Sequence, residues 1–182
     1  KEIGLKGNGR ADFMIGIYDN NKLVDYAHCE FQSDATTGTR GIVQCVKDFY
    51  ENKSIAKNYN FGLNTKATIK GFSLQMIDKG FLFKKLGKTS IWVMQDHLVD
   101  TFEKIYNLDL TEDKTFNPMS SNNIYIVETQ LNLKNGQKYK LNVSRILNVS
   151  PEQIQKALSK KDPIKNDYIL DQINKKMDYE VL

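Results

Sequence analysis

Three side chains near the start of the chain have the types and spacing that metal-dependent phosphodiester hydrolysis requires: Asp12, Glu30 and Gln32. A magnesium ion held by two carboxylates can activate water, neutralise charge at phosphorus and stabilise the leaving 3′ oxygen. Gln32 follows Glu30 by two residues, so on a strand both side chains lie on one face, where the amide could orient the water or the phosphate. The same spacing also occurs on ordinary solvated strand faces, and spacing alone leaves both interpretations open.

The elements that must position these residues are predicted to be two strands of a β-hairpin. Apolar and β-branched residues favour strands over 11–18 and 23–33, and the polar residues 19–22 between them are typical of a turn. The Glu30 strand is mostly apolar, and Asp12 stands between Ala11 and Phe13. A carboxylate embedded in such a strand needs a partner, which a metal would supply.

The hydrophobic pattern also predicts the register of this hairpin. With a three-residue loop, Asp12 lies opposite Glu30, and a β-bulge could produce the same alignment. On the other face, expected to be the core, this register pairs apolar residues only: Phe13 with Cys29, Ile15 with Ala27, and Ala11 with Phe31.

The remaining pattern predicts a mixed α/β domain with helices packed on a sheet. The apolar run 91–94 is typical of a buried, central parallel strand, and residues 107–122 read as a long loop. Helices are expected at about 41–50, 64–86, 97–106, from 150 onward and 164–177, and a second hairpin at 123–133 and 137–144 with its turn at Asn135-Gly136.

Glu2, the segment 9–13 and the segment 28–32 together resemble the active-site strands of PD-(D/E)XK restriction endonucleases. The variant with glutamine in place of the usual lysine is most similar to the NotI family. The run 91–96 is similar to the buried strand that follows the central helices in such enzymes, so the resemblance covers roughly residues 1–106. One departure is that the NotI family carries a four-cysteine metal site, whereas this chain has two cysteines.

The resemblance implies an α/β fold with a PD-(D/E)XK core, in which a mixed central sheet is flanked by helices and extended by a C-terminal β-hairpin and helices. It implies one nuclease domain over 1–182, with the catalytic core in 1–106 and an extension in 107–182 for DNA or dimer contacts. In this interpretation Asp12 and Glu30 bind Mg²⁺, for which Mn²⁺ would substitute. Gln32 replaces the lysine, and Glu2 is an additional acidic residue from a preceding helix.

Candidate DNA-binding residues flank these strands. Hydroxyls, amides and an arginine at a helix N-terminus are good phosphate ligands, although a helix cap with a solvated arginine explains the same pattern. Arg10 could touch the same phosphate or be a rim charge, and His28 and His97 are more often structural than catalytic at such positions. The candidates are Arg10, Ser33, Thr36, Thr37, Arg40 and Gln95, with Lys134, Lys138, Lys140 and Arg145 on the second hairpin.

Bulk properties are compatible with these expectations. The net charge of +4 suits a polyanionic partner without requiring one. No apolar run approaches the roughly 20 residues of a membrane-spanning helix. Cys29 and Cys45 form no C-x-x-C motif and are interpreted as small buried residues in a reducing cytoplasm. The chain starts without methionine or a signal peptide, and truncation at the N-terminus is expected.

The expected function is therefore a magnesium-dependent type II restriction endonuclease, a homodimer that cuts palindromic double-stranded DNA. Two alternatives remain. The same nuclease chemistry could act on branched DNA or RNA, or the chain could be a non-catalytic DNA-binding or interaction module.

Overall fold

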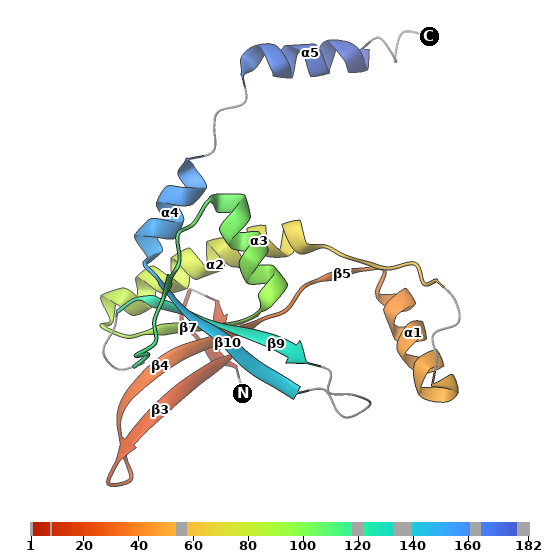
Figure 1. Ribbon diagram of the computed structural model, residues 1–182. Helices are drawn as coiled ribbons and strands as arrows, with labels where there is room; N and C mark the ends of the chain where they lie inside the picture. The colour runs from red at the N-terminus through yellow and green to blue at the C-terminus, as the bar shows by residue number, and fades with distance from the viewer. Residues whose placement is uncertain are drawn as a thin grey trace.

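A computed structural model of the chain describes residues 2–7, 9–53, 58–117, 122–132, 140–160 and 165–177 (Figure 1). The strands are β1 (Ile3–Gly4), β2 (Arg10–Ala11), β3 (Phe13–Asp19), β4 (Lys22–Gln32), β5 (Thr36–Thr37), β6 (Gly62–Leu63), β7 (Ser90–Gln95), β8 (Thr111–Glu112), β9 (Ile124–Asn132) and β10 (Lys140–Val149). The helices are α1 (Thr39–Asn52), α2 (Thr65–Lys85), α3 (Asp96–Tyr106), α4 (Pro151–Ser159) and α5 (Asn166–Met177).

The central sheet has six strands in the order β3-β4-β7-β9-β10-β8. Strands β4, β7 and β9 are mutually parallel, and the outer strands pair antiparallel to their neighbours. The mixed sheet with helices and the central, parallel position of the apolar run in β7 are thereby confirmed. Continuous hydrophobicity suits β7 because it is hydrogen-bonded on both edges and largely buried.

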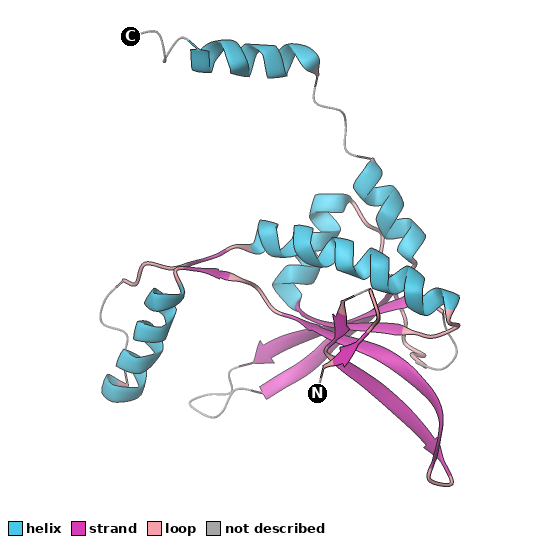
Figure 2. Cartoon of the chain, turned by 180° about the vertical axis from the view of Figure 1, so that it is seen from behind, coloured by secondary structure: helices cyan, strands magenta, loops and turns pink. Residues whose placement is uncertain are grey.

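The main core lies between the sheet and helices α2, α3 and α4, which cover one of its faces (Figure 2). Trp92 and Ile126 from the sheet meet Phe72, Phe102 and Ile154 from the helices, and all five are almost fully buried. Helix α4 begins with the expected capping box, in which Ser150 and Gln153 exchange side-chain and backbone hydrogen bonds. None of the described helices combines the length and apolar character needed to cross a membrane.

The first hairpin has the predicted register at the candidate site, but a shorter turn and a β-bulge produce this register instead of a three-residue loop. The structure pairs Phe13 with Cys29 and Ile15 with Ala27 as expected. The turn, however, has two residues with positive φ, Asn20 and Asn21, rather than three. A bulge in β4, where the pairing shifts between Ile17 and Tyr18, restores the alignment.

The prediction that this hairpin's apolar face belongs to the core is wrong for Phe13 and Ile15 on the edge strand β3. Ala27 and Cys29 are buried with Ile91, whereas Phe13 is 52% and Ile15 45% exposed. The reason lies in the layering: helices α2, α3 and α4 pack on the opposite face of the sheet, the one that carries His28 and Glu30. No sequence pattern says which face a helix will cover.

Three further expectations need correction. The segment 107–117 is not only loop, because β8 within it pairs with β10 at the sheet edge. Strand β10 extends to Val149, beyond the predicted end at 144. Residues 36–37, expected to be loop, form β5, which pairs with β6. The Asn135-Gly136 turn and the side chains of Lys134 and Lys138 fall outside the described residues.

The segment 34–64 leaves the sheet as an arm. Strands β5 and β6 form a two-stranded stalk, and α1 stands at its end, set apart from the body of the molecule (Figures 1 and 2). No residue of α1 is buried. Cys45, expected to be buried, lies half-buried on this helix, whereas Cys29 is buried as predicted.

Candidate active site

Asp12 and Glu30 meet where two neighbouring strands run side by side. Asp12 stands between β2 and β3, and its Oδ2 accepts a hydrogen bond from the backbone N–H of Phe31 at 3.0 Å. The backbone N–H of Asp12 lies 3.3 Å from Glu30 Oε1. Each acidic residue is thus tied to the backbone of the other's strand. The register therefore brings together the two carboxylates that the sequence predicted to be partners.

Glu30 is not on a solvated strand face, because it is only 6% exposed. Its Oε1 accepts hydrogen bonds from the ammonium of Lys79 at 2.7 Å and from the Nε2–H of His28 at 2.8 Å. A buried carboxylate requires such compensation. The partner expected from burial is therefore present within the chain itself.

Lys79 is the functional candidate that the sequence interpretation missed. It comes from α2, 49 residues beyond Glu30, and it also donates a 2.7 Å hydrogen bond to the backbone carbonyl of Arg10, just before Asp12. One signal pointed to it: Phe72, Met76 and Phe83 mark the buried stripe of α2, and Lys79 occupies the same stripe. A lysine at a buried helical position needs a nearby acceptor.

A hydrogen-bonded chain continues behind Glu30. His28 Nδ1 lies 2.8 Å from the hydroxyl oxygen of Ser90, which also accepts from the indole N–H of Trp92 at 3.0 Å. The imidazole is fully buried and stacks on Phe83 with ring centroids 4.3 Å apart. The imidazole directs its Nε2–H at the Glu30 carboxylate, which can only accept, while Nδ1 faces the Ser90 hydroxyl.

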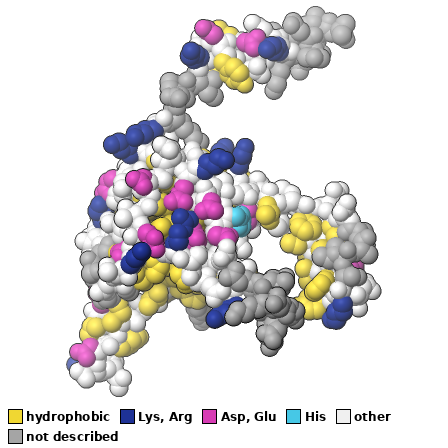
Figure 3. Space-filling model, viewed as in Figure 1, with side chains coloured by type: hydrophobic (Ala, Val, Ile, Leu, Met, Phe, Trp, Pro, Cys, Tyr) yellow, Lys and Arg dark blue, Asp and Glu magenta, His cyan; other side chains and the backbone are white. Residues whose placement is uncertain are grey.

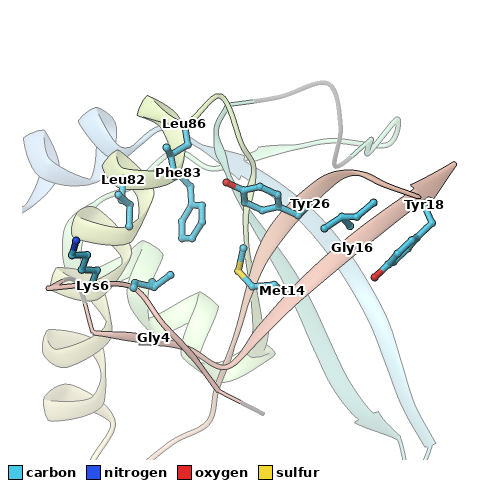
Figure 4. A pocket seen from close by; sticks show the side chains of 11 residues that line it. Gly4, Lys6, Met14, Gly16, Tyr18, Tyr26, Leu82, Phe83 and Leu86 are labelled. Atoms are coloured by element: carbon cyan, nitrogen blue, oxygen red, sulfur yellow. The ribbon is translucent and has the colours of Figure 1, made fainter. Parts of the chain in front are cut away.

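Phe83 also lines a largely apolar pocket of about 530 Å³ (Figure 4). The pocket lies between the N-terminal segment, β3, β4 and the end of α2, with Met14 and Tyr26 among its walls. Phe83 adjoins the polar chain through its ring contact with His28, and Met14 lies opposite His28 in the β3–β4 pair. This pocket is therefore a neighbour of the candidate site rather than part of it.

The electrostatics of Glu30 favour its ionised form. Burial raises its pKa, but the hydrogen bonds from His28 and Lys79 outweigh burial, and the net pKa lies below the usual range of a glutamate. Glu30 is therefore an anion at neutral pH. The neighbouring Cys29 thiol, in contrast, stays neutral, because burial and the two acidic neighbours raise its pKa to about 11.

The donor set fits a hard divalent cation. All hydrogen bonds to Glu30 from described residues end on Oε1, which leaves Oε2 without a partner among them. Among the described side chains, every fully buried oxygen or nitrogen has a partner, so Oε2 is not fully buried. Glu30 Oε2 therefore retains contact with solvent, beside the half-exposed carboxylate of Asp12. Two carboxylates suit Mg²⁺, which keeps several waters or phosphate oxygens as further ligands. No group of three or more His, Cys, Asp or Glu residues suited to a metal occurs among the described residues.

The side chains of Glu2, Gln32 and Arg10 do not join this network, although the Arg10 backbone carbonyl accepts from Lys79. Glu2 lies just before β1, not on a helix, and its carboxylate pairs with the Arg10 guanidinium at 2.9 Å. Both side chains are mostly exposed. Gln32 is half-buried, and its amide donates to the backbone carbonyl of Ser33 at 2.9 Å. No hydrogen bond of the described structure joins the Gln32 side chain to Asp12 or Glu30.

A second polar cluster lies where β4 and β7 end. Asp34 Oδ2 accepts a hydrogen bond from the Thr65 hydroxyl at 2.5 Å and Oδ1 accepts from the Thr68 hydroxyl at 3.0 Å, while His97 Nε2 lies 3.3 Å from Oδ2. Burial raises the pKa of Asp34, but these hydrogen bonds together lower it by more, so the net pKa lies below its usual value. Asp34 thereby joins the start of α2 to the start of α3.

We expect Asp34→Asn to destabilise the protein by about 1–3 kcal/mol at pH 7, because an amide presents hydrogen atoms to hydroxyl donors already in place. A group with a lowered folded-state pKa stabilises above its ordinary value of about 3.9 and loses this contribution as pH falls through the folded value. Urea unfolding at pH 7 and pH 3 should show the mutant's deficit shrinking at the lower pH. An equal deficit at both values would exclude the carboxylate's charge as its origin.

The predicted DNA-binding residues are spread around this end of the sheet. Gln95 is half-buried at the end of β7, Ser33 is exposed, and Arg40 is exposed at the start of α1. Thr36 lies in the stalk, and the Thr37 hydroxyl donates to the Gly62 carbonyl at 3.2 Å. None of these side chains lies in the hydrogen-bond network around Glu30.

Arg145, proposed for DNA contact, is engaged within the chain. Its guanidinium pairs with Glu128, and with Asp100 at 3.0 Å and Glu103 at 3.5 Å. The hydrogen bonds that the guanidinium donates to the Glu128 carboxylate raise the pKa of Arg145. Three carboxylates surround one cation, so this residue ties β10 and β9 to α3 rather than presenting a free charge to phosphate.

A comparison with models of known protein families finds no match, and a search of curated proteins finds no significant relative.

Proposed function

We propose that this chain is a magnesium-dependent endonuclease of the PD-(D/E)XK type that hydrolyses double-stranded DNA at a specific site, as type II restriction enzymes do. One observation carries the proposal: the buried Glu30 carboxylate lies 2.7 Å from the Lys79 ammonium and 3.3 Å from the backbone N–H of Asp12 beside it. Two anions and one cation on rigid elements are what activation of water beside a phosphodiester requires.

Each residue of the candidate site has a separate role in the proposed reaction. Asp12 and Glu30 would hold Mg²⁺ through their solvent-facing oxygens, and the bound ion would lower the pKa of a water and neutralise charge at phosphorus. Lys79 keeps Glu30 ionised and, through its hydrogen bond to the Arg10 carbonyl, holds the backbone next to Asp12 in place. His28 fixes the orientation of the same carboxylate from the other side.

Gln32 takes the place where a lysine would carry a positive charge in the resembled motif. An amide is neutral, so it can orient a water or a phosphate oxygen but cannot stabilise negative charge as strongly. Lys79 lies on the same side of the sheet and supplies a positive charge from a helix. This division of roles between Gln32 and Lys79 is part of the proposal.

The decisive experiment is incubation of the protein with phage DNA in Mg²⁺ and in EDTA, beside Glu30→Gln. Discrete fragments that need both Mg²⁺ and Glu30 are expected, and sequencing their ends would identify the site. Parallel incubations with branched DNA and with RNA test the other substrates of the same chemistry. Cleavage by Glu30→Gln at the rate of the unmodified protein would overturn the site assignment.

A non-catalytic DNA-binding module is the second candidate, and the completeness of the ion network favours it. Glu30, Lys79 and His28 satisfy one another without a further ligand. Such a module predicts no cleavage of any nucleic acid and no thermal stabilisation by Mg²⁺ or Mn²⁺. A rise in melting temperature with Mn²⁺ that is lost in Asp12→Asn would speak against it.

A further inference from the structure

Helix α1 presents an apolar face that no other described part of the chain covers. Val43, Val46, Phe49 and Tyr50 recur at helical spacing, and each is close to half exposed or more, with Val46 at 47%. Figure 3 shows hydrophobic side chains gathered on this separate part of the molecule, across an open gap from the body. A soluble monomer rarely leaves such a helix face exposed.

The opposite side of α1 is already packed, so the exposed face is not a consequence of a loosely built arm. The returning segment 58–61 lies against the start of the helix: a Cβ added to Gly41 would come within 2.7 Å of the Asn60 carbonyl oxygen. The Tyr59 hydroxyl donates to Asp48 at 2.5 Å, and Gln44 donates to the same carboxylate at 2.6 Å. The arm is thus held together from its polar side.

The charges beside the apolar face are self-complementary. Arg40 at the amino end and Glu51 at the carboxyl end flank it on the same side and form no ion pair with described residues. Lys47 lies between them, so the arm has no strong excess of either sign. A polyanion would gain little from a row of valine and phenylalanine. In an antiparallel pair of α1 helices, each Arg40 lies beside the other copy's Glu51, and the helix dipoles oppose each other favourably.

We propose that α1 is a dimerisation arm whose apolar face packs antiparallel against α1 of a second copy of this chain. The pairing buries Val46 and Phe49 at the centre and forms two equivalent Arg40–Glu51 ion pairs at the rim, as a two-fold axis requires. This assignment does not depend on the chemistry proposed for Asp12 and Glu30. It gives Arg40 a role in assembly instead of the phosphate contact predicted from the sequence.

The test is the mass of the full chain in solution, measured by sedimentation at 1–100 µM. The unmodified protein is expected to approach twice the chain mass of 20.9 kDa. Val46→Glu should remain monomeric over this range, while Leu74→Glu, at an exposed leucine on α2, should behave as the unmodified protein. Because Val46 and Leu74 are both exposed, neither substitution removes a buried contact within one copy of the chain, and both variants should keep their secondary structure.

Charge reversal tests the antiparallel arrangement. Arg40→Glu should weaken the dimer about tenfold, and adding Glu51→Arg to it should restore the dimer to within about twofold. Cys45 is half-buried on α1 and Cys29 is buried in the sheet, so a short bis-maleimide should link two copies through Cys45 and fail with Cys45→Ser.

A monomeric unmodified protein, or a dimer indifferent to Val46→Glu, would overturn the proposal. So would failure of the double reversal to restore dimerisation. Loss of DNA binding in Arg40→Glu without any change in mass would assign the arm to nucleic acid instead.

Discussion

Asp12→Asn is expected to lower magnesium-dependent DNA cleavage at least about 10³-fold while leaving the fold intact. Asparagine keeps a carbonyl oxygen in the position that accepts the Phe31 N–H at 3.0 Å, so the strand contact survives. What it loses is the negative charge, which a hard divalent cation needs. Initial rates on supercoiled plasmid measure the effect, and the melting temperature and DNA affinity should be preserved, since removing an anion does not oppose phosphate binding.

Asp19→Asn is the matched control, because Asp19 is an exposed carboxylate on the same strand β3, at its far end. It should cleave at the unmodified rate. Activity of Asp12→Asn within about tenfold of the unmodified protein would remove Asp12 from the metal site. Comparison with Glu30→Gln adds information, because that change also disturbs the buried network: we expect it to lose both cleavage and stability.

Lys79→Met is expected to destabilise the protein by about 3–5 kcal/mol at pH 7, the largest effect predicted for a single side chain here. Methionine fills similar space but leaves Glu30 buried beside His28 alone. The folded-state pKa of Glu30 is lowered, so its contribution to stability is present above its ordinary value of about 4.3 and is lost as pH falls through the folded value. The deficit of the mutant should therefore shrink at acidic pH.

Urea unfolding of two further variants checks this explanation. Glu30→Gln combined with Lys79→Met removes both charges and should be more stable than Lys79→Met alone. Lys84→Met removes an exposed lysine from the same helix, paired with Glu152 at 2.7 Å, and should cost less than about 1 kcal/mol. If the double variant were as unstable as the single one, lost packing around the lysine stem, not the unpaired carboxylate, would be the cause.

Local sequence patterns predicted most of the secondary structure, because each of these elements depends on residues that are close together in the chain. The stripe that defines α2, the capping box of α4 and the apolar run of β7 depend on residues a few positions apart. The hairpin register was predictable because a one-residue slip would move every apolar side chain to the other face. Even the wrong turn length did not alter the register at the site, since the bulge in β4, opposite the step from Ile17 to Tyr18, absorbed the difference.

For the candidate site too, the short-range features were predictable from the sequence and the long-range contacts were not. The sequence by itself determined that Asp12 and Glu30 oppose each other, because adjacent strands and their register are short-range properties. Only the tertiary structure decided that α2 covers this face of the sheet and brings Lys79 to Glu30, that Glu2 pairs with Arg10, and that Phe13 stays exposed. Which face a helix covers depends on packing between segments far apart in the chain, and periodicity shows only that a helix has a buried side, never what it is buried against.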